Sequence, residues 1–451
     1  MESLKDQFLL RPDIHFLNFG SFGATPKPIF EKYQAWQRVL EAEPVQFIAF
    51  DGYQYLADSR AALAKFLNCK DKDDLVYVTN PSFAINMIAK SFPLEAGDEI
   101  LTTDIEYGAC DRTWNYYCTK KGANYRRQKI NLPIVDKAQF IEDFFKGYNE
   151  KTKAIFISHI TSATGLILPA EEICAIAKEK GLITIVDGAH APAHIPLDLS
   201  SIQADFYTGA CHKWMMAPKG CSFLYAHKKV QHICDPLVVS WGYKALKPSH
   251  SSFLDYHQMI GTRDFSAFLC VEECIAFMEK HDWKNMAKTC HQLVLKYATR
   301  FFELLGSTPI SPLTSEWIGQ MVSIPIKTKE PEQLQRKLFT ELMNNKVRTP
   351  VVIGRAYGDL TQEQLQLSAS ADFGALLLDG LGDGIFIAAE NCGSYQSINS
   401  LAFGILQASR TRISKTEYIS CPSCGRTLFD LQETTAKIRK ETSHLKGLKI
   451  G

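Results

Sequence analysis

The sequence has almost no net charge. Its 50 Lys and Arg residues face 49 Asp and Glu residues, which leaves +1 over 451 residues. Bulk attraction to nucleic acid or to an anionic membrane needs an excess of basic residues, so neither partner is expected. No apolar run approaches the roughly 20 residues that span a bilayer, and the first ten residues carry charges where a signal peptide needs an unbroken apolar stretch. The sequence therefore predicts a cytoplasmic protein that acts on small molecules.

The chain also lacks a regular cysteine framework. Its 13 cysteines are scattered, and in a chain of this size such thiols are typically reduced and buried. Only Cys421 and Cys424 stand at a spacing worth considering for a metal or cluster site. The sequence contains no internal repeat and no low-complexity tract, and its length favours two or three globular domains.

Short β-branched runs alternate with longer amphipathic segments from about residue 55. Strands are predicted at 75–79, 99–102, 154–158, 183–187 and 205–208, with helices near 55–68, from 82, from 108 and at 171–180. This alternation indicates an α/β domain with a mainly parallel sheet, whose ligands collect at the carboxyl ends of the strands. Farther along, a long helix at about 265–306, a strand at 321–326 and a helix at 331–344 predict a smaller α+β domain.

Two of the predicted strands lead to an acid and to an amine. One strand ends at Asp187, and the other runs into Lys213. Pyridoxal 5′-phosphate (PLP) chemistry requires such a pair, because a lysine forms a Schiff base with the cofactor and a carboxylate keeps its pyridine nitrogen protonated. An Asp-Gly turn after a strand and a solvated lysine are equally common readings of these residues taken alone.

The stretch Thr79-Asn-Pro-Ser-Phe-Ala-Ile-Asn86 ends one strand and opens a helix. Ser82 is predicted as the N-cap of that helix. The free N–H groups of a helix start suit a phosphate group, although any capping serine has this appearance.

Seven short motifs together carry a resemblance to a known family. They are Asn18-Phe-Gly-Ser-Phe-Gly23, Asp104-Ile-Glu-Tyr-Gly-Ala109, Ser158-His-Ile-Thr-Ser-Ala-Thr-Gly165, Asp187-Gly-Ala-His190, Cys211-His-Lys-Trp214, Ser240-Trp-Gly242 and Gly261-Thr-Arg-Asp264. In order and spacing they resemble class V aminotransferases, and most of all the isopenicillin N epimerase-like branch, over residues 10–350. The resemblance implies PLP as cofactor and the PLP-dependent fold type I, with a mainly parallel seven-stranded sheet in the large domain and a smaller α+β domain.

The resemblance implies a role for each matching residue. Lys213 is the Schiff-base (internal aldimine) lysine and the proton shuttle at Cα, Asp187 pairs with the pyridinium, and His190 hydrogen-bonds the phenolic oxygen of the cofactor. Further cofactor contacts follow from the same motifs. Tyr107 stacks on the ring, Ser162 assists His190 at the phenolic oxygen, and the phosphate is bound by Ser82, Thr208 and His212.

Thr262 matches a family position that reaches the phosphate in the neighbouring subunit, which implies a homodimer with shared active sites. Arg263 either holds a substrate carboxylate or makes a structural ion pair. Asn18 and Phe22 match the family's substrate-covering loop. The implied substrate is a small amino acid, and the implied reaction is epimerisation or transamination at Cα. Sulfur removal from cysteine needs a mobile cysteine in the small domain, whereas no cysteine lies between Cys290 and Cys392.

The resemblance breaks near residue 350. Residues 351–451 are similar to a fragment of 4-hydroxy-3-methylbut-2-enyl diphosphate synthase, an iron–sulfur enzyme of isoprenoid biosynthesis. Cys421 and Cys424 match two cluster ligands of that family; two thiolates are too few for a four-iron cluster or a zinc site, so no metal is expected unless a partner chain completes the set.

The predicted domains are therefore an N-terminal arm with the substrate loop (1–30), a PLP-binding large domain (31–264), a partial small domain (265–350) and the tail (351–451). The tail is either a real fusion or a gene-model error, and it is expected to pack poorly. Two other functions stay open. One is an iron–sulfur protein of isoprenoid synthesis. The other is a catalytically inactive PLP-fold scaffold, because the family's small domain continues past about residue 350 to a strand with an arginine for the substrate carboxylate, and that strand is not found in this sequence.

Overall fold

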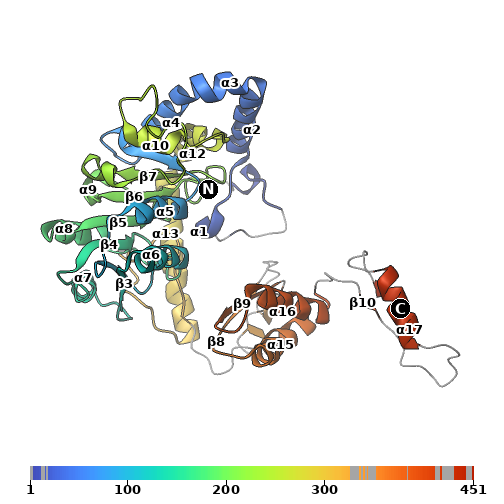
Figure 1. Cartoon of the computed structure of the whole chain (residues 1–451). Helices are drawn as coiled ribbons and strands as arrows, with labels where there is room; N and C mark the ends of the chain where they lie inside the picture. Colours follow the sequence, from blue (N-terminus) through green and yellow to red (C-terminus); the bar gives the residue numbers. More distant parts are fainter. Residues whose placement is uncertain are drawn as a thin grey trace. The chain divides into compact units, whose positions relative to one another are not determined.

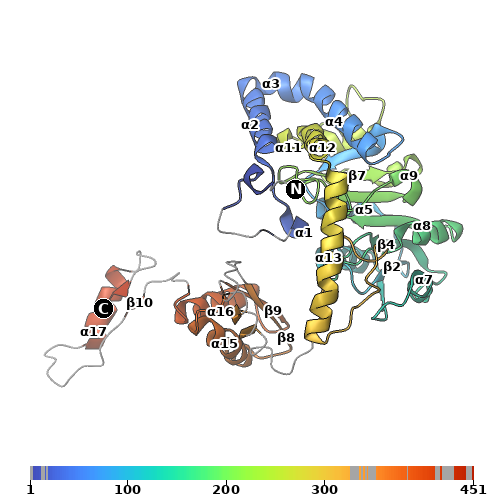
Figure 2. The same ribbon diagram turned by 180° about the vertical axis from the view of Figure 1, so that it is seen from behind.

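The computed structural model describes residues 4–11, 16, 19–325, 335–336, 339–340, 343, 352–382, 384–411, 417–418, 431–442 and 449–450. Its contacts divide the chain into two compact units (Figures 1 and 2). Unit 1 comprises Met1–Leu10 and Phe16–Lys327, and unit 2 comprises Arg11–His15 and Thr328–Gly451. The sequence places the domain boundary at 350, whereas the contacts change at 327.

A seven-stranded sheet in the order β1-β7-β6-β5-β4-β2-β3 forms the centre of unit 1. Only β7 runs antiparallel to its neighbours, β1 and β6, while the remaining neighbouring pairs are parallel. The predicted α/β fold with a mainly parallel seven-stranded sheet is confirmed. The strands are β1 (Leu75–Val78), β2 (Glu99–Thr103), β3 (Asn124–Gln128), β4 (Thr152–Ser158), β5 (Ile183–Gly188), β6 (Phe206–Ala210) and β7 (Ser222–Ala226).

Both faces of this sheet are buried. On β4, Ile155 and Ile157 belong to one hydrophobic cluster, while Phe156 belongs to a second cluster on the opposite face. Successive side chains of a strand point to opposite faces, so an apolar run without alternation is what a sheet covered on both sides requires. Because the strands are apolar on both faces, they read as β-branched runs in the sequence. β3 was not predicted because it is a polar edge strand, Asn-Tyr-Arg-Arg-Gln.

Helices cover the two faces, as both ribbon views show (Figures 1 and 2). The longer ones are α2 (Lys27–Ala42), α4 (Gly52–Phe66), α5 (Pro81–Ser91), α6 (Gly108–Lys121), α7 (Lys137–Phe145), α8 (Ala170–Glu179), α12 (Val271–Lys280) and α13 (Trp283–Leu305). The shorter ones are η1 (Lys5–Gln7), α1 (Phe19–Phe22), α3 (Pro44–Gln46), η2 (Phe47–Asp51), η3 (Lys72–Asp74), α9 (Leu199–Ile202), η4 (Lys228–Ile233), α10 (Ser252–Gln258) and α11 (Ser266–Leu269).

Two predictions for the end of unit 1 are wrong. The single helix expected at 265–306 is three helices, α11, α12 and α13, and the last break lies at Asp282, whose φ of 48° is left-handed and cannot continue a helix. The strand expected at 321–326 is absent over 321–325; the backbone of Gln320 instead donates to His194 Nε2. The helix expected at 331–344 lies mostly outside the described residues.

Unit 2 contains a parallel pair of strands, β8 (Val352–Gly358) and β9 (Gly384–Glu390), with α15 (Gln362–Leu378) and α16 (Tyr395–Ala408). Its own core is built around buried Ile353, Phe373 and Leu376. The expectation of poor packing is therefore wrong for this core, because the two helices bury apolar side chains against one face of the strands. The remaining elements are β10 (Glu417–Tyr418), α17 (Leu431–Glu441) and β11 (Lys449–Ile450).

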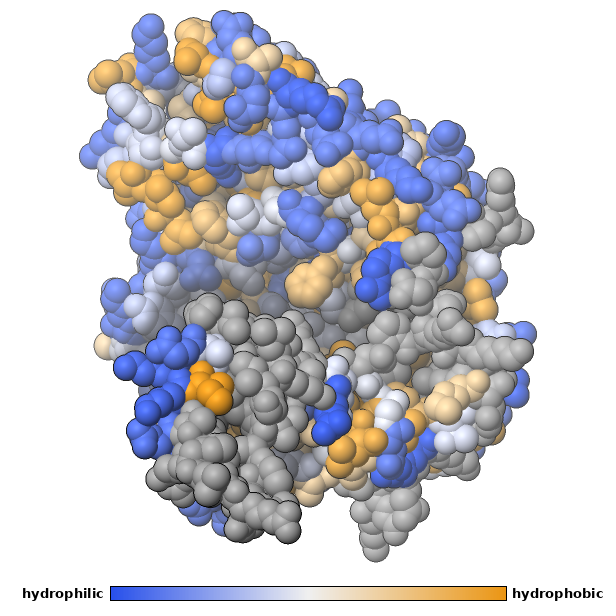
Figure 3. Space-filling view, turned by 90° about the vertical axis from the view of Figure 1, so that its right-hand side faces the viewer, coloured by the Kyte–Doolittle hydropathy of each residue, from blue (hydrophilic) through white to orange (hydrophobic). Residues whose placement is uncertain are grey.

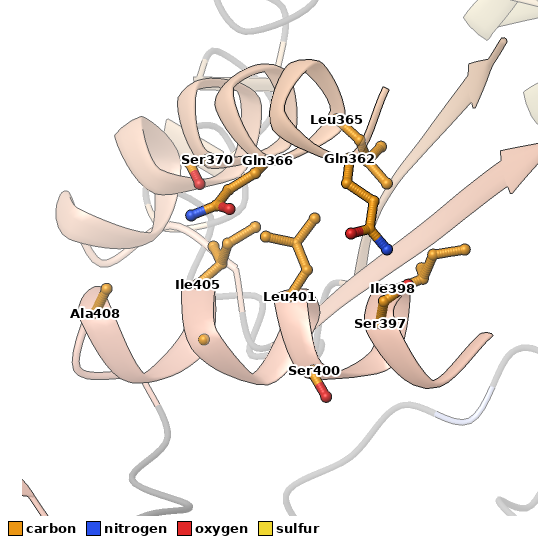
Figure 4. Close-up of a pocket in the computed structure, with 11 residues that line it drawn as sticks. Gln362, Leu365, Gln366, Ser370, Ser397, Ile398, Ser400, Leu401, Ile405 and Ala408 are labelled. Carbon is orange, nitrogen blue, oxygen red and sulfur yellow. The ribbon is translucent and has the colours of Figure 1, made fainter. Parts of the chain in front are cut away.

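A groove of about 520 Å³ lies between α15 and α16 (Figure 4). Leucine and isoleucine side chains, including Leu365, Leu401 and Ile405, line it together with polar Gln362 and Gln366. On the face of the molecule in Figure 3, hydrophilic and apolar side chains are intermingled. Among the described residues, no helix has the length and apolar character needed to cross a membrane.

Candidate active site

A cavity of about 460 Å³ lies in unit 1 where β4 and β5 end and where α5 and α6 begin. This is the sheet edge at which the sequence predicts a ligand. Most of the predicted site residues line it. The lining comprises Ser21, Phe22, Thr79, Asn80, Pro81, Ser82, Tyr107, Ser158, Ile160, Ser162, Asp187, Ala189, His190, His212, Lys213, Lys219 and Gly220.

Lys213 and His190 meet at this cavity. Lys213 Nζ lies 3.2 Å from His190 Nε2. Burial lowers the pKa of Lys213, although nearby Asp187 acts in the opposite direction. Burial, with the charge of Lys213, lowers the pKa of His190 to about 3, so His190 is neutral and its Nε2 can accept a hydrogen bond from Lys213. His190 Nδ1 is then the protonated nitrogen, a tautomer inferred from this contact, and it is buried without a partner among the described residues.

Asp187 is the last but one residue of β5 and is 3% exposed. Its Oδ1 accepts a hydrogen bond of 2.9 Å from the backbone N–H of Ala189, and its Oδ2 lies 3.5 Å from Cys110 Sγ, which donates. Burial raises the pKa of Asp187, while the Ala189 N–H and the charge of Lys213 oppose that rise. The site thus holds a carboxyl and an amine within one enclosed region, as the chemistry of PLP requires.

The start of α5 corrects one prediction. Asn80, not Ser82, is the N-cap, because the side chain of Asn80 accepts a hydrogen bond of 2.9 Å from the N–H of Phe83. Pro81 occupies the first helical position and Ser82 the second, so Ser82 still lines the cavity within the turn whose N–H groups lack helical partners. The prediction placed the cap at Ser82 because Asn and Ser are both favourable N-cap residues.

Thr208 does not line the cavity. Its hydroxyl donates to the carbonyl of Phe223 on the adjacent strand β7 at 2.8 Å, and the residue is fully enclosed in the sheet. The phosphate role predicted for Thr208 is therefore not supported by its hydrogen bond. His212 does line the cavity; its Nδ1 lies 2.8 Å from the carbonyl of Cys221, and burial lowers its pKa to about 4. The proton on Nδ1 is donated in the hydrogen bond to the Cys221 carbonyl. His212 must therefore bind a second proton, at Nε2, before that nitrogen can donate to an anion.

The mouth of the cavity carries aromatic side chains. Tyr107, which precedes α6, is 44% exposed, and Phe22 at the end of α1 is 71% exposed. The segment with Phe22 lies against the lysine turn, because a Cβ on Gly23 would meet the carbonyl oxygen of His212 at 2.2 Å. Gly23 also has a φ of +64°, so a larger residue here would both clash and be strained. The N-terminal segment thus contributes Ser21 and Phe22 to one side of the cavity.

Two predicted residues, Thr262 and Arg263, lie away from the cavity. Thr262 is exposed and Arg263 is half-buried, and neither lines the cavity. Arg263 lies over the ring of Phe268, 5.2 Å from its centroid, and burial lowers its pKa to about 10. No ion pair of Arg263 occurs within the described ranges, so the structural ion pair is not observed there. Asn18 lies outside the described residues.

Sequence reasoning missed four residues near this cavity: Glu106, Cys110, Ser158 and Lys219. Glu106 and Cys110 lie behind the cavity and contact Ser158 and Asp187, respectively. For Glu106 a signal was present, because this acid stands directly before Tyr107, the residue predicted to stack on the cofactor ring.

A family model described as Aminotransferase class-V matches residues 25–350. The chain belongs to the class V aminotransferase family. Its cofactor is pyridoxal 5′-phosphate. The family resemblance predicted from the motifs is confirmed.

Several relatives of this family are similar over most of their length. Isopenicillin N epimerase of Streptomyces clavuligerus is 32% identical over 332 residues, which are 71% of this chain and 83% of the relative. Putative L-cysteine desulfhydrase 1 of Oryza sativa subsp. japonica is 29% identical, over 68% of this chain and 66% of the relative. The cysteine desulfurase of Thermococcus onnurineus NA1, solved without cofactor, superposes with a TM-score of 0.63 at 21% identity, covering 75% of this chain and 85% of that structure. The last comparison shows the fold alone.

The tail is similar to a different protein. A 4-hydroxy-3-methylbut-2-en-1-yl diphosphate synthase (flavodoxin) from Parabacteroides distasonis is 57% identical over 117 residues, which are 26% of this chain and 19% of the synthase. The predicted similarity of the tail to a fragment of this enzyme is confirmed. Cys421 and Cys424 lie outside the described residues, and no cluster of three His, Cys, Asp or Glu side chains suited to a metal occurs in the described part of the chain.

The side chains around the cavity fit PLP. The carboxyl of Asp187, the amine of Lys213 and the ring of His190, whose Nδ1 has no partner among the described residues, belong to the lining of one cavity. These are respectively a partner for a ring nitrogen, an amine for an aldehyde and a donor for an oxygen anion.

Proposed function

We propose that this protein is a PLP-dependent enzyme that acts at the Cα of a small amino acid, by epimerisation or transamination, with Lys213 as the catalytic amine. The observation that carries the proposal is the placement of Lys213 Nζ beside His190 Nε2 in the cavity whose wall contains Asp187. The similarity to isopenicillin N epimerase over 83% of that protein supports chemistry at Cα.

The proposed cofactor contacts follow from the lining of the cavity. Asp187 would hold the ring nitrogen, His190 the phenolic oxygen and Ser82 with His212 the phosphate, while Tyr107 would stack on the ring and Ser162 would assist. When bound, PLP withdraws electrons from the Cα of an attached amino acid, which makes the Cα–H bond acidic.

Lys213 would move the proton of Cα. Burial lowers the pKa of Lys213, which makes it easier for Nζ to release a proton and take one up again. His190 cannot compete for that proton, because burial and the neighbouring Lys213 keep its ring neutral; it orients Nζ through Nε2 instead. Phe22 and Tyr107 at the mouth would limit the access of water.

Substrate binding and assembly stay proposals. Half-buried Arg263 lies over Phe268 and outside the cavity lining, contacts the Gln258 carbonyl at 3.5 Å and has no ion-pair partner in the described part of the chain; we propose it as a candidate for binding the substrate carboxylate. Exposed Thr262 would reach the phosphate in the neighbouring subunit of a homodimer. Asn18 would join Phe22 in covering the substrate.

The test is a pair of measurements on wild type and Lys213→Ala. The wild type should show a visible absorption band that borohydride bleaches, and an amino-acid substrate should lose its Cα proton signal by NMR in deuterated water. Lys213→Ala should lose both, with proton exchange reduced by about 10²–10⁴-fold or more, as expected for loss of a general base. Lys228→Ala, a change of an exposed lysine on η4, is the matched control.

Either result has a clear meaning. A folded wild type with no cofactor band would overturn the proposal, and a band that no amino acid perturbs would favour the inactive scaffold. Optical rotation of the recovered amino acid then separates epimerisation from transamination, which instead yields a keto acid. The synthase activity is not proposed, because the tail covers only 19% of the synthase to which it is similar.

A further inference from the structure

A second carboxyl, Glu106, is buried behind the cavity. It is 7% exposed and follows β2 immediately before Tyr107. Its Oε1 accepts a hydrogen bond of 2.7 Å from the Thr103 hydroxyl, and its Oε2 accepts a bond of 2.9 Å from the backbone N–H of Ser158 and another from the Ser158 hydroxyl. Glu106 therefore touches no open part of the cavity but is bonded to Ser158, which lines it.

Sheet register brings this carboxyl close to Asp187. Ser158, the last residue of β4, is the direct partner of Asp187 on β5. The charge of Asp187 contributes to the raised pKa of Glu106, so the two carboxyls interact electrostatically. Among the described residues, Cys110 on α6 and Tyr125 on β3 also interact electrostatically with Glu106. No cationic group is among them, whereas Lys213 faces Asp187.

Two buried carboxyls that interact in this way do not both ionise readily, because each charge is costly to bury and repels the other. The hydrogen-bond partners indicate which carboxyl keeps the proton. Two of the three donors to Glu106 are hydroxyl groups, and a hydroxyl can turn to accept a hydrogen bond from a protonated carboxyl. Asp187 is instead stabilised as an anion by a backbone N–H, which can only donate, and by Lys213.

We infer that Glu106 is a positioning residue that holds the proton of this carboxyl pair, and that Asp187 thereby stays ionised towards the cofactor. The inference deepens the proposed function, on which the role of Asp187 rests. Consistent with the geometry, burial raises the pKa of Glu106 to about 8.

Infrared spectroscopy of the full-length protein tests this directly. A protonated buried carboxyl gives a C=O stretching band distinct from that of a carboxylate, and the wild type should lose one such band as the pH rises through about 8. Glu106→Gln should lack the band, because its amide replaces the protonated acid by accepting from the Ser158 N–H and donating to the Thr103 hydroxyl. Glu171→Gln, at an exposed acid in the first turn of α8, should retain it.

A second variant keeps the test decisive if Glu106→Gln does not fold. Ser158→Ala removes a hydroxyl that lowers the pKa of Glu106, so Glu106 should bind its proton about tenfold more tightly and the band should disappear at higher pH. A band that persists in Glu106→Gln, or a midpoint that Ser158→Ala leaves unchanged, overturns the inference. Because the infrared band does not depend on turnover, it reports on Glu106 even if no amino acid proves to be a substrate.

Discussion

Unit 1 and unit 2 contain parallel strands in very different surroundings. In β4 of unit 1 six of the seven residues are buried, whereas in β8 of unit 2 the only buried residue is Ile353. Unit 2 is nevertheless the part with the higher identity to a known protein, at 57% against 32% for unit 1. Percentage identity therefore does not indicate how completely a strand is buried. Parallel strands need cover on both faces, and the tail matches only 19% of the length of the synthase.

The largest effect that sharpens this comparison is expected from paired core substitutions. Ile155→Ala in β4 should destabilise unit 1 by about 3–5 kcal/mol, because the surrounding sheet is tightly enclosed and a cavity would remain. Ile353→Ala in β8 should cost about 2 kcal/mol, since a strand pair with one open face can relax around the smaller side chain.

The two units can be followed separately in urea. All six tryptophans precede residue 318, so tryptophan fluorescence reports unit 1, while hydrogen exchange of peptides from α15 reports unit 2. A lower urea midpoint of the fluorescence transition in Ile353→Ala would show that the two units are energetically coupled, which would contradict their treatment as separate cores.

The second prediction concerns alkaline pH. The pKa of Glu106 is raised from 4.5 to about 8 in the folded protein, so its stabilising contribution is complete below about pH 4.5 and is lost as the pH rises through about 8. Glu106→Gln should melt at a higher temperature than wild type above about pH 8 and show no such advantage near pH 5. Each 1 kcal/mol should move the melting temperature by roughly 2–4 °C. Scanning calorimetry should show this difference in the transition of unit 1; an equal gap at both pH values would contradict it.

The smallest effect is expected on the open face of unit 2. Phe386 in β9 is 63% exposed, so Phe386→Ser should change the unfolding free energy by no more than about 0.5 kcal/mol. It should, however, reduce aggregation measured by light scattering, since an exposed apolar strand pairs readily with other chains. The matched change Phe373→Ser, at a buried position of α15, should cost about 3–5 kcal/mol. Unchanged scattering in Phe386→Ser would mean that this face is not the one that aggregates.

Much of the fold could be predicted from local pattern. Runs such as 154–157 (Ala-Ile-Phe-Ile) are apolar at every position, and that pattern predicted buried parallel strands. The predictions failed where local and tertiary signals differ. The polar sequence of β3 is compatible with an edge strand only once β2 supplies its partner, and the helix expected at 265–306 breaks at Asp282 because of a backbone conformation that no residue pattern there reveals.

The site shows the same division. The sequence by itself determined that Asp187 and Lys213 lie at one edge of the sheet, because each stands at or just after the carboxyl end of a predicted parallel strand. Only the tertiary structure decided that the Thr208 hydroxyl donates to the Phe223 carbonyl and that Asn80 caps α5 in place of Ser82. It also brought Glu106 to within hydrogen-bonding distance of Ser158 and so next to Asp187. Such pairings depend on sheet register and side-chain direction across segments that are far apart in the chain, and a linear sequence carries no direct record of either.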